Sequence, residues 1–265
     1  MPRSEREPKR VIYYRDAANE DYAGTNINTQ TVTADFPFAP KSRVWRFFAW
    51  IAYYVIAIPL VHLCCYVFCG YHVKNKKAVR ALRRTGYFLY ANHSHFTDAF
   101  LSPITAFPKR AFVIVGPDTV SIKGIRTFVQ MLGAIPIPQS VKGMKPFWDA
   151  VELRVKEGNC VGIFPEGHMW NYCTFLRPFK SGSFRYPVSM GVPSVAVAVT
   201  YQRRHIPFFR SPRRTVFVSD PIFPDAALPP KEAQRKLERE VESFIREKME
   251  TYSTYKYYDY RQVNG

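Results

Sequence analysis

The sequence has few cysteines and lacks the short motifs of several large enzyme classes. Five cysteines stand among 265 residues, three of them within one apolar run, and no two form a C-x-x-C pair. This excludes a disulfide framework and a zinc site of the usual spacing, and it suits a reducing compartment. The sequence also contains no G-x-S-x-G, G-x-x-x-x-G-K-[ST] or G-x-G-x-x-G. The usual serine-hydrolase, P-loop and dinucleotide sites are therefore excluded.

Acidic residues are scarce beside basic ones. The 38 Lys and Arg residues against 21 Asp and Glu residues give a net charge of +17, which predicts an anionic partner: nucleic acid, an acidic membrane surface or a phosphorylated substrate. From Val73 to Trp148 there are twelve basic residues and only two acids, Asp98 and Asp118. Because no helix-turn-helix, RRM or zinc pattern is present, we expect no nucleic-acid partner.

Composition divides the chain into a polar, loosely ordered tail over residues 1–40, a membrane anchor over 41–72 and a folded domain over 73–265. The tail has mixed charge and no sustained periodicity. Between Phe47 and Cys69 there is no charged residue, and about 20 apolar residues suffice to cross a bilayer as a helix. Pro59 tends to kink such a helix. A bent, re-entrant or one-leaflet anchor therefore stays open, as does a buried core helix.

After Val73 short apolar runs alternate with longer amphipathic ones. This pattern predicts a single α/β domain with a central mixed β-sheet flanked by helices. We expect strands at Tyr87–Ala91, Ala111–Val115, Ala134–Ile137, Cys160–Phe164, Ser194–Thr200 and Thr215–Val218. We expect helices near 97–105, 121–131, 144–157, 182–190 and 231–251, the last an amphipathic helix that packs across the core.

A histidine and an aspartate follow the strand expected at Tyr87–Ala91. The chain continues Asn92-His93-Ser94-His95-Phe96-Thr97-Asp98, and catalytic groups in open α/β sheets tend to lie beyond the carboxyl ends of strands. The spacing lets Asp98 fold back onto one ring nitrogen of His93 while the other nitrogen faces a hydroxyl. The carboxylate then fixes the tautomer and stabilises the imidazolium. The pattern predicts a general base for a substrate hydroxyl.

A second polar cluster follows the strand expected at Cys160–Phe164. It reads Phe164-Pro165-Glu166-Gly167-His168. A Glu-Gly pair after a strand offers a carboxylate for a hydroxyl and backbone amides that approach an anion closely. A simple turn residue or helix N-cap is the alternative interpretation of Glu166.

These two clusters resemble the motifs of the glycerolipid acyltransferase family, of the lysophosphatidic-acid acyltransferase type. The first matches its N-H-x4-D motif and the second its F-P-E-G motif, with 73 residues from His93 to Glu166. Residues 132–137 resemble the second family motif and residues 192–197 the fourth. The resemblance covers residues 86–220, and the joint occurrence of the motifs makes it specific.

The resemblance implies a glycerol-3-phosphate acyltransferase-like fold and an O-acyltransferase of phospholipid biosynthesis. Such an enzyme moves an acyl group from coenzyme A or acyl carrier protein to a hydroxyl of a lysophospholipid or glycerol phosphate. His93 is then the general base and Asp98 its partner. The residues expected to bind the acceptor are Phe164, Pro165, Glu166, Gly167, Lys142 and Lys145. No metal or cofactor is expected, because the thioester is already activated. We expect a phospholipid membrane as partner, with the catalytic domain on its cytoplasmic face.

The sequence also departs from the family pattern. His95 stands where the family often has Ser or Thr, and the second and third motifs continue Pro138-Gln139 and His168-Met169 where the family usually carries arginines that bind acceptor phosphate. Either the acceptor is not the usual phosphorylated glycerol, or other cations replace them: Lys142, Lys145, Arg177 and Lys180. The alternative functions are acyl transfer to a non-phosphorylated acceptor and a catalytically inactive lipid-binding relative.

Overall fold

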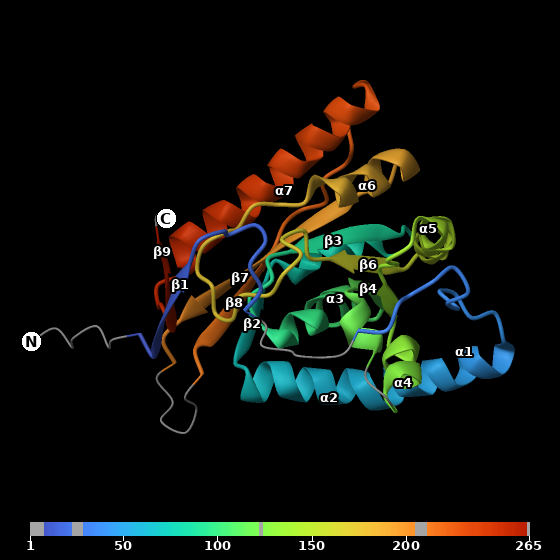
Figure 1. The fold of residues 1–265 in the computed structure, drawn as a ribbon, viewed down its shortest axis with the longest axis horizontal. Helices are drawn as coiled ribbons and strands as arrows, with labels where there is room; N and C mark the ends of the chain where they lie inside the picture. Colours follow the sequence, from blue (N-terminus) through green and yellow to red (C-terminus); the bar gives the residue numbers. More distant parts are fainter. Residues whose placement is uncertain (1–7, 23–28, 122–123, 205–210, 264–265) are drawn as a thin grey trace, which may run out of the picture.

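The computed structural model describes residues 8–22, 29–121, 124–204 and 211–263. Its centre is a seven-stranded sheet in the order β2-β8-β7-β3-β6-β4-β5 (Figure 1). Strands β3 to β7 run parallel to one another, whereas β8 is antiparallel to β7 and parallel to β2. The strands are β2 Tyr71–Lys74, β3 Tyr87–Ala91, β4 Ala111–Val115, β5 Ala134–Pro136, β6 Cys160–Ile163, β7 Ser194–Gln202 and β8 Arg213–Val218. The predicted mixed sheet is confirmed.

Helices cover both faces of the sheet. They are α3 Leu101–Ala106, α4 Arg126–Met131, α5 Val141–Lys156, α6 Arg185–Met190 and α7 Pro230–Tyr252. Figure 1 shows α6 and α7 on one side of the sheet and α3 on the other. Alternate residues of a strand face opposite sides, so Phe88 and Tyr90 join the core under α5, α6 and α7, while Leu89 joins the core with Leu101 of α3.

The central strands form because their residues are apolar on both faces. Every residue of β3 is buried, and parallel strands that are covered on both sides read as continuous apolar runs. Helix α7 instead buries one stripe, made of Ala233, Leu237, Val241, Ile245 and Met249. The six expected strands and the last amphipathic helix are confirmed. The edge strand β2 was missed because it has only four residues, YHVK, and the predicted boundary between anchor and domain at residue 73 divides it.

The apolar run forms one continuous helix over Arg43–Phe68. It consists of α1 Arg43–Trp50, a π-helical stretch Ile51–Ala57, α2 Ile58–His62 and a second π-helical stretch Leu63–Phe68. Pro59 stands in the first turn of α2, directly after a π-helical stretch, a place where the missing N–H of proline is tolerated because the hydrogen-bond register changes. The helix therefore continues past Pro59.

This N-terminal helix lies along the domain and packs through one face (Figure 1). Ala49, Ala52, Tyr53, Val61 and Cys65 are buried, and Tyr53 Oη accepts a hydrogen bond from Ala111 N at 2.9 Å. The other face is apolar but exposed, and carries Phe47, Phe48, Val55, Ile56, Leu60, Leu63, Val67 and Phe68. By length and composition it can cross a bilayer.

The prediction of a loosely ordered tail over residues 1–40 is wrong for its described parts. Strand β1 (Arg10–Tyr14) pairs in parallel with β9 (Tyr258–Gln262) at the other end of the chain. Val32, Phe36 and Phe38 are buried in the core. Local periodicity does not reveal these elements, because their partners lie far away in the sequence.

Candidate active site

The chain leaves β3 at Asn92, whose buried side chain extends the pairing with β7. Its Nδ2 donates to Val199 O at 3.1 Å, and its Oδ1 accepts from Val199 N at 2.8 Å. A carboxamide supplies both a donor and an acceptor, so it replaces a strand residue in this pairing. His93 is therefore held at a fixed point beyond the carboxyl end of β3.

Asp98 is fully buried, and its Oδ2 collects three donors. The backbone amides of Ser94 and His95 donate to it at 2.6 and 2.7 Å, and His93 Nδ1 lies 3.3 Å away. The carboxylate also caps the 3-10 helix Phe96–Phe100, so the turn itself folds Asp98 back. When Asp98 is ionised it can only accept, so a neutral His93 then donates from Nδ1 and leaves Nε2 as the basic nitrogen.

The segment after β6 meets the segment after β3, since the two strands are neighbours. The ring of Phe164 stacks on His93 at a centroid distance of 4.3 Å and an angle of 20°. Trp170 N donates to His93 O at 3.2 Å, and Tyr172 N donates to Ser94 O at 2.6 Å. We call residues 92–98 the His93 loop and residues 164–168 the Glu166 loop. The two predicted clusters therefore lie together in space.

Glu166 points into the protein rather than toward an open site. Its residue is 2% exposed and forms an ion pair with Arg177, which is 1% exposed. Arg177 Nη2 also donates to His93 O at 3.4 Å and to His168 O. Burial raises the pKa of Glu166, whereas Arg177 and the amide of His93 oppose that rise. This differs from the acceptor contact that the sequence predicts: the pair ties the two loops together.

Gly167 and Lys180 shape the exposed side of the Glu166 loop. Gly167 has a φ of +79°, and a Cβ on it would lie 3.0 Å from Lys180 Nζ, so only glycine fits. The amide of Lys180 donates to the carbonyl of the buried Pro165 at 2.8 Å. Its exposed Nζ lies 3.3 Å from His168 Nε2. Burial and the nearby Lys180 lower the pKa of His168. An exposed cation and a neutral imidazole therefore stand beside His93.

Comparison with known proteins identifies this arrangement. Residues 71–200, which run from β2 into β7 and include both loops, match the model of the family described as Acyltransferase. The crystal structure of the 1-acyl-sn-glycerophosphate (LPA) acyltransferase PlsC from Thermotoga maritima shares the fold, with a TM-score of 0.50 and 19% identity over 67% of this chain and 71% of that chain. The chain therefore contains a segment, residues 71–200, that is similar to the Acyltransferase family. No curated protein sequence gives a match.

The chain carries Lys142 and Lys145 on the first turns of α5. Both side chains are exposed, and Lys145 Nζ pairs with Asp149 Oδ2 at 2.7 Å. Within the described ranges, no hydrogen bond or ion pair connects either lysine with His93 or the Glu166 loop. The structure does not bring them together with the other site residues. Their part in acceptor binding stays a prediction.

His95 supports the His93 loop from within the protein. Its residue is 6% exposed, and Nδ1 lies 2.7 Å from Thr97 Oγ1 at the start of the 3-10 helix. Burial lowers the pKa of His95 to about 4, and nearby Arg214 adds to the effect. His95 therefore stays neutral near pH 7.

Sequence reasoning missed a buried cation behind the His93 loop. Arg214 in β8 is 1% exposed. Its guanidinium carbon lies 5.6, 5.5 and 5.9 Å from the ring centres of Tyr71, Tyr172 and Tyr201. The hydroxyl of Tyr201 donates to Ser94 O at 3.2 Å. An arginine in a strand ordinarily predicts an exposed position, so the sequence contains no signal for this support.

Proposed function

We propose that this acyltransferase uses His93 as general base to move an acyl group from an acyl thioester to a hydroxyl of a lysophospholipid or glycerol-phosphate acceptor. The observation that carries the proposal is the 3.3 Å contact between His93 Nδ1 and Asp98 Oδ2. The carboxylate is fixed by two backbone amides, and the His93 side chain is 22% exposed. Nε2 is therefore both basic and reachable.

In the proposed reaction, Nε2 removes the proton of the acceptor hydroxyl while the hydroxyl oxygen attacks the thioester carbonyl carbon. The buried Asp98 stabilises the imidazolium that forms. When the tetrahedral intermediate collapses, the carbon–sulfur bond breaks and the imidazolium returns its proton to the thiolate. The products are a new ester and the free thiol of coenzyme A or acyl carrier protein. No cofactor is required, since the thioester supplies the driving force.

Lys180 and His168 support a phosphorylated acceptor. His168 is the last residue of the Glu166 loop, and the exposed Lys180 Nζ lies 3.3 Å from its Nε2. A lysine can bind phosphate as a point charge, which would replace the arginines that the family motifs carry. We therefore assign acceptor phosphate to Lys180 rather than to Lys142 and Lys145.

The N-terminal helix supports attachment to a phospholipid membrane. Its exposed apolar face runs along one side of the domain, and such a face is stable when it is buried at the boundary of head groups and acyl chains. A helix in this position holds the domain against the surface that contains its lipid acceptor. We propose that this is the cytoplasmic face, where free cysteines such as Cys160 and Cys173 stay reduced.

Transfer of a labelled acyl group tests the proposal. Detergent-purified protein receives acyl-CoA or acyl carrier protein with a panel of phosphorylated and non-phosphorylated lipid acceptors. We expect a labelled phospholipid as product. We also expect Lys180→Ala to raise the KM for the phosphorylated acceptor by about tenfold, because a hydrogen bond to a charged group is lost. Lys231→Ala, on the exposed start of α7, serves as control.

Two results would contradict this proposal. An unchanged KM in Lys180→Ala would remove the phosphate assignment. Binding of lysophospholipid by folded protein without any transfer would instead favour a catalytically inactive lipid-binding relative.

A further inference from the structure

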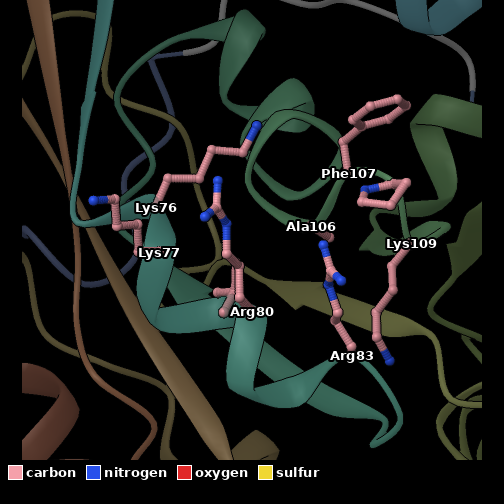
Figure 2. A pocket seen from close by; sticks show the side chains of 9 residues that line it. Lys76, Lys77, Arg80, Arg83, Ala106, Phe107 and Lys109 are labelled. Carbon is pink, nitrogen blue, oxygen red and sulfur yellow. The ribbon is translucent and has the colours of Figure 1, made fainter.

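A second basic site lies away from the two loops. A cavity of about 610 Å³ is formed by the 3-10 helix Lys76–Leu82, the residue after it and the segment that follows α3 (Figure 2). Its lining is half cationic and half apolar, without a carboxylate: Lys76, Lys77, Val79, Arg80, Arg83, Ala106, Phe107, Pro108 and Lys109. Figure 2 shows the side chain of Arg83 extending to Ala106 and that of Arg80 extending toward Lys76.

Most of these cations have no counter-charge in the protein. Lys109 Nζ donates to the carbonyls of Thr85, at 2.8 Å, and Gly158. For the side chains of the other four basic residues, the described part of the chain offers no hydrogen bond or ion pair. Burial and the nearby Arg80 lower the pKa of Lys76. The cluster therefore contains charge that an external anion would stabilise.

The cavity adjoins the N-terminal helix. The ring of Phe107, 42% exposed, lies 5.5 Å from that of His62, and Tyr54 Oη donates to Pro108 O at 3.2 Å. The apolar rim of the cavity is thus continuous with the helix whose outer face is apolar. If that face lies in a membrane, the cations stand at the depth of the lipid head groups.

The cavity is separate from the candidate active site. Helix α3 begins next to the His93 loop and ends at Ala106, in the cavity wall. Six residues of helix span about 9 Å, and β3 and β4 start on this side of the sheet, opposite the edge that carries His93. An anion bound here therefore does not occupy the place of the acceptor phosphate.

We propose that this cavity binds the head group of an anionic phospholipid in the membrane surface. The phosphate would lie against Lys76, Arg80 and Arg83, and the glycerol backbone against Phe107 and Pro108. Basic residues next to an anionic membrane surface strengthen binding to that surface. The inference rests on the proposed membrane attachment. It adds that the bound head group would fix the orientation of the domain, and so of the candidate active site, relative to the bilayer.

Vesicle co-flotation of the full chain, without substrates, tests the proposal. Vesicles contain either phosphatidylcholine alone or equal parts of phosphatidylcholine and phosphatidylserine. Arg80→Glu with Arg83→Glu should weaken binding to the anionic vesicles by roughly tenfold or more, while binding to phosphatidylcholine stays unchanged. The control, Arg235→Glu with Arg239→Glu, changes net charge equally on the exposed side of α7.

The outcomes separate the competing explanations. Equal losses in both double variants would overturn the proposal, because they would reflect net charge alone. Displacement of the wild type from anionic vesicles by soluble coenzyme A, but not by inorganic phosphate, would also overturn it in favour of a donor site. Because His93→Ala should bind anionic vesicles like the wild type, failure of the proposed transfer chemistry is distinguishable from failure of this site.

Discussion

At the scale of single residues, the Glu166–Arg177 pair is the clearest difference between a family role and this structure. Both side chains are almost completely buried, and Arg177 holds the carbonyl of His93. A buried pair loses about 3 kcal/mol or more when one partner loses its charge. The pair is therefore expected to act through the position of His93 rather than through the acceptor.

We predict that Glu166→Gln lowers the free energy of unfolding by about 3 kcal/mol and lowers kcat, while the KM for the acceptor changes little. Urea unfolding and steady-state kinetics measure the two effects. Asp149→Asn, which weakens an exposed pair with Lys145, is the control and should change neither. A raised KM with unchanged kcat and stability would show that Glu166 binds the acceptor after all.

The burial of His95 predicts how the free energy of unfolding depends on pH. Its pKa is about 4 in the folded chain, below the ordinary 6.5, so between these values the unfolded chain binds more protons and acid favours unfolding. Lowering the pH from 6.5 to 5 should cost about 2 kcal/mol through this group alone. His95→Asn keeps a side chain that can cap the helix. Because it does not titrate, its free energy of unfolding should fall less than that of the wild type over this pH range, by the contribution of His95. Identical pH profiles of the unfolding free energy would contradict the burial of His95.

The sequence predicted the residues of the site better than their surroundings. The spacing of His93 and Asp98 is a local property of one turn, and it was sufficient to predict their contact. Burial of Glu166 depends on its ion pair with Arg177, eleven residues later. The place of Arg214 behind the His93 loop depends on three tyrosines from other segments of the chain. Such partners are set by tertiary packing, which a local pattern does not contain.

At the scale of elements, the N-terminal helix carries the proposed attachment to the membrane. It packs on α3 and α4 through small and aromatic residues, and its outer face remains apolar. Leu60 and Leu63 are 59% and 49% exposed, so they can be changed without opening the core.

We predict that Leu60→Ser with Leu63→Ser weakens binding to phosphatidylcholine vesicles by about a hundredfold or more, because each leucine loses roughly 1.5 kcal/mol or more of burial in lipid. The melting temperature should stay within a few degrees of the wild type. Val141→Ser with Phe223→Ser removes exposed apolar residues elsewhere and serves as control. Equal vesicle binding by the wild type and both variants would exclude the helix as the membrane contact.

Elements with strong local signals were predictable and those with remote partners were not. Continuous apolar runs indicated β3, β4, β6 and β7, and the 3.6-residue period indicated α7. The β1–β9 pair joins residues near the two ends of the chain. Neither strand alternates strongly, and their pairing and their contacts with Trp170 are both remote in sequence.

At the scale of the whole molecule, apolar and basic surfaces gather on one side. The N-terminal helix and the cationic cavity adjoin each other, whereas α7 covers the opposite side of the sheet (Figure 1). The five basic residues of the cavity, which contribute to the net charge of +17, therefore lie on the same side of the molecule as the N-terminal helix. This arrangement is the one expected if the proposed membrane attachment and the proposed head-group site are both correct.

The most direct test of His93 as the general base compares the rate of acyl transfer by His93→Ala with that of the wild type, with folding checked by circular dichroism. His72→Ala, an exposed histidine on β2, is the control. We predict that His93→Ala loses transfer by about a hundredfold to ten-thousandfold, the usual contribution of a general base, while His72→Ala keeps it. Full activity in a folded His93→Ala protein would contradict the proposed mechanism.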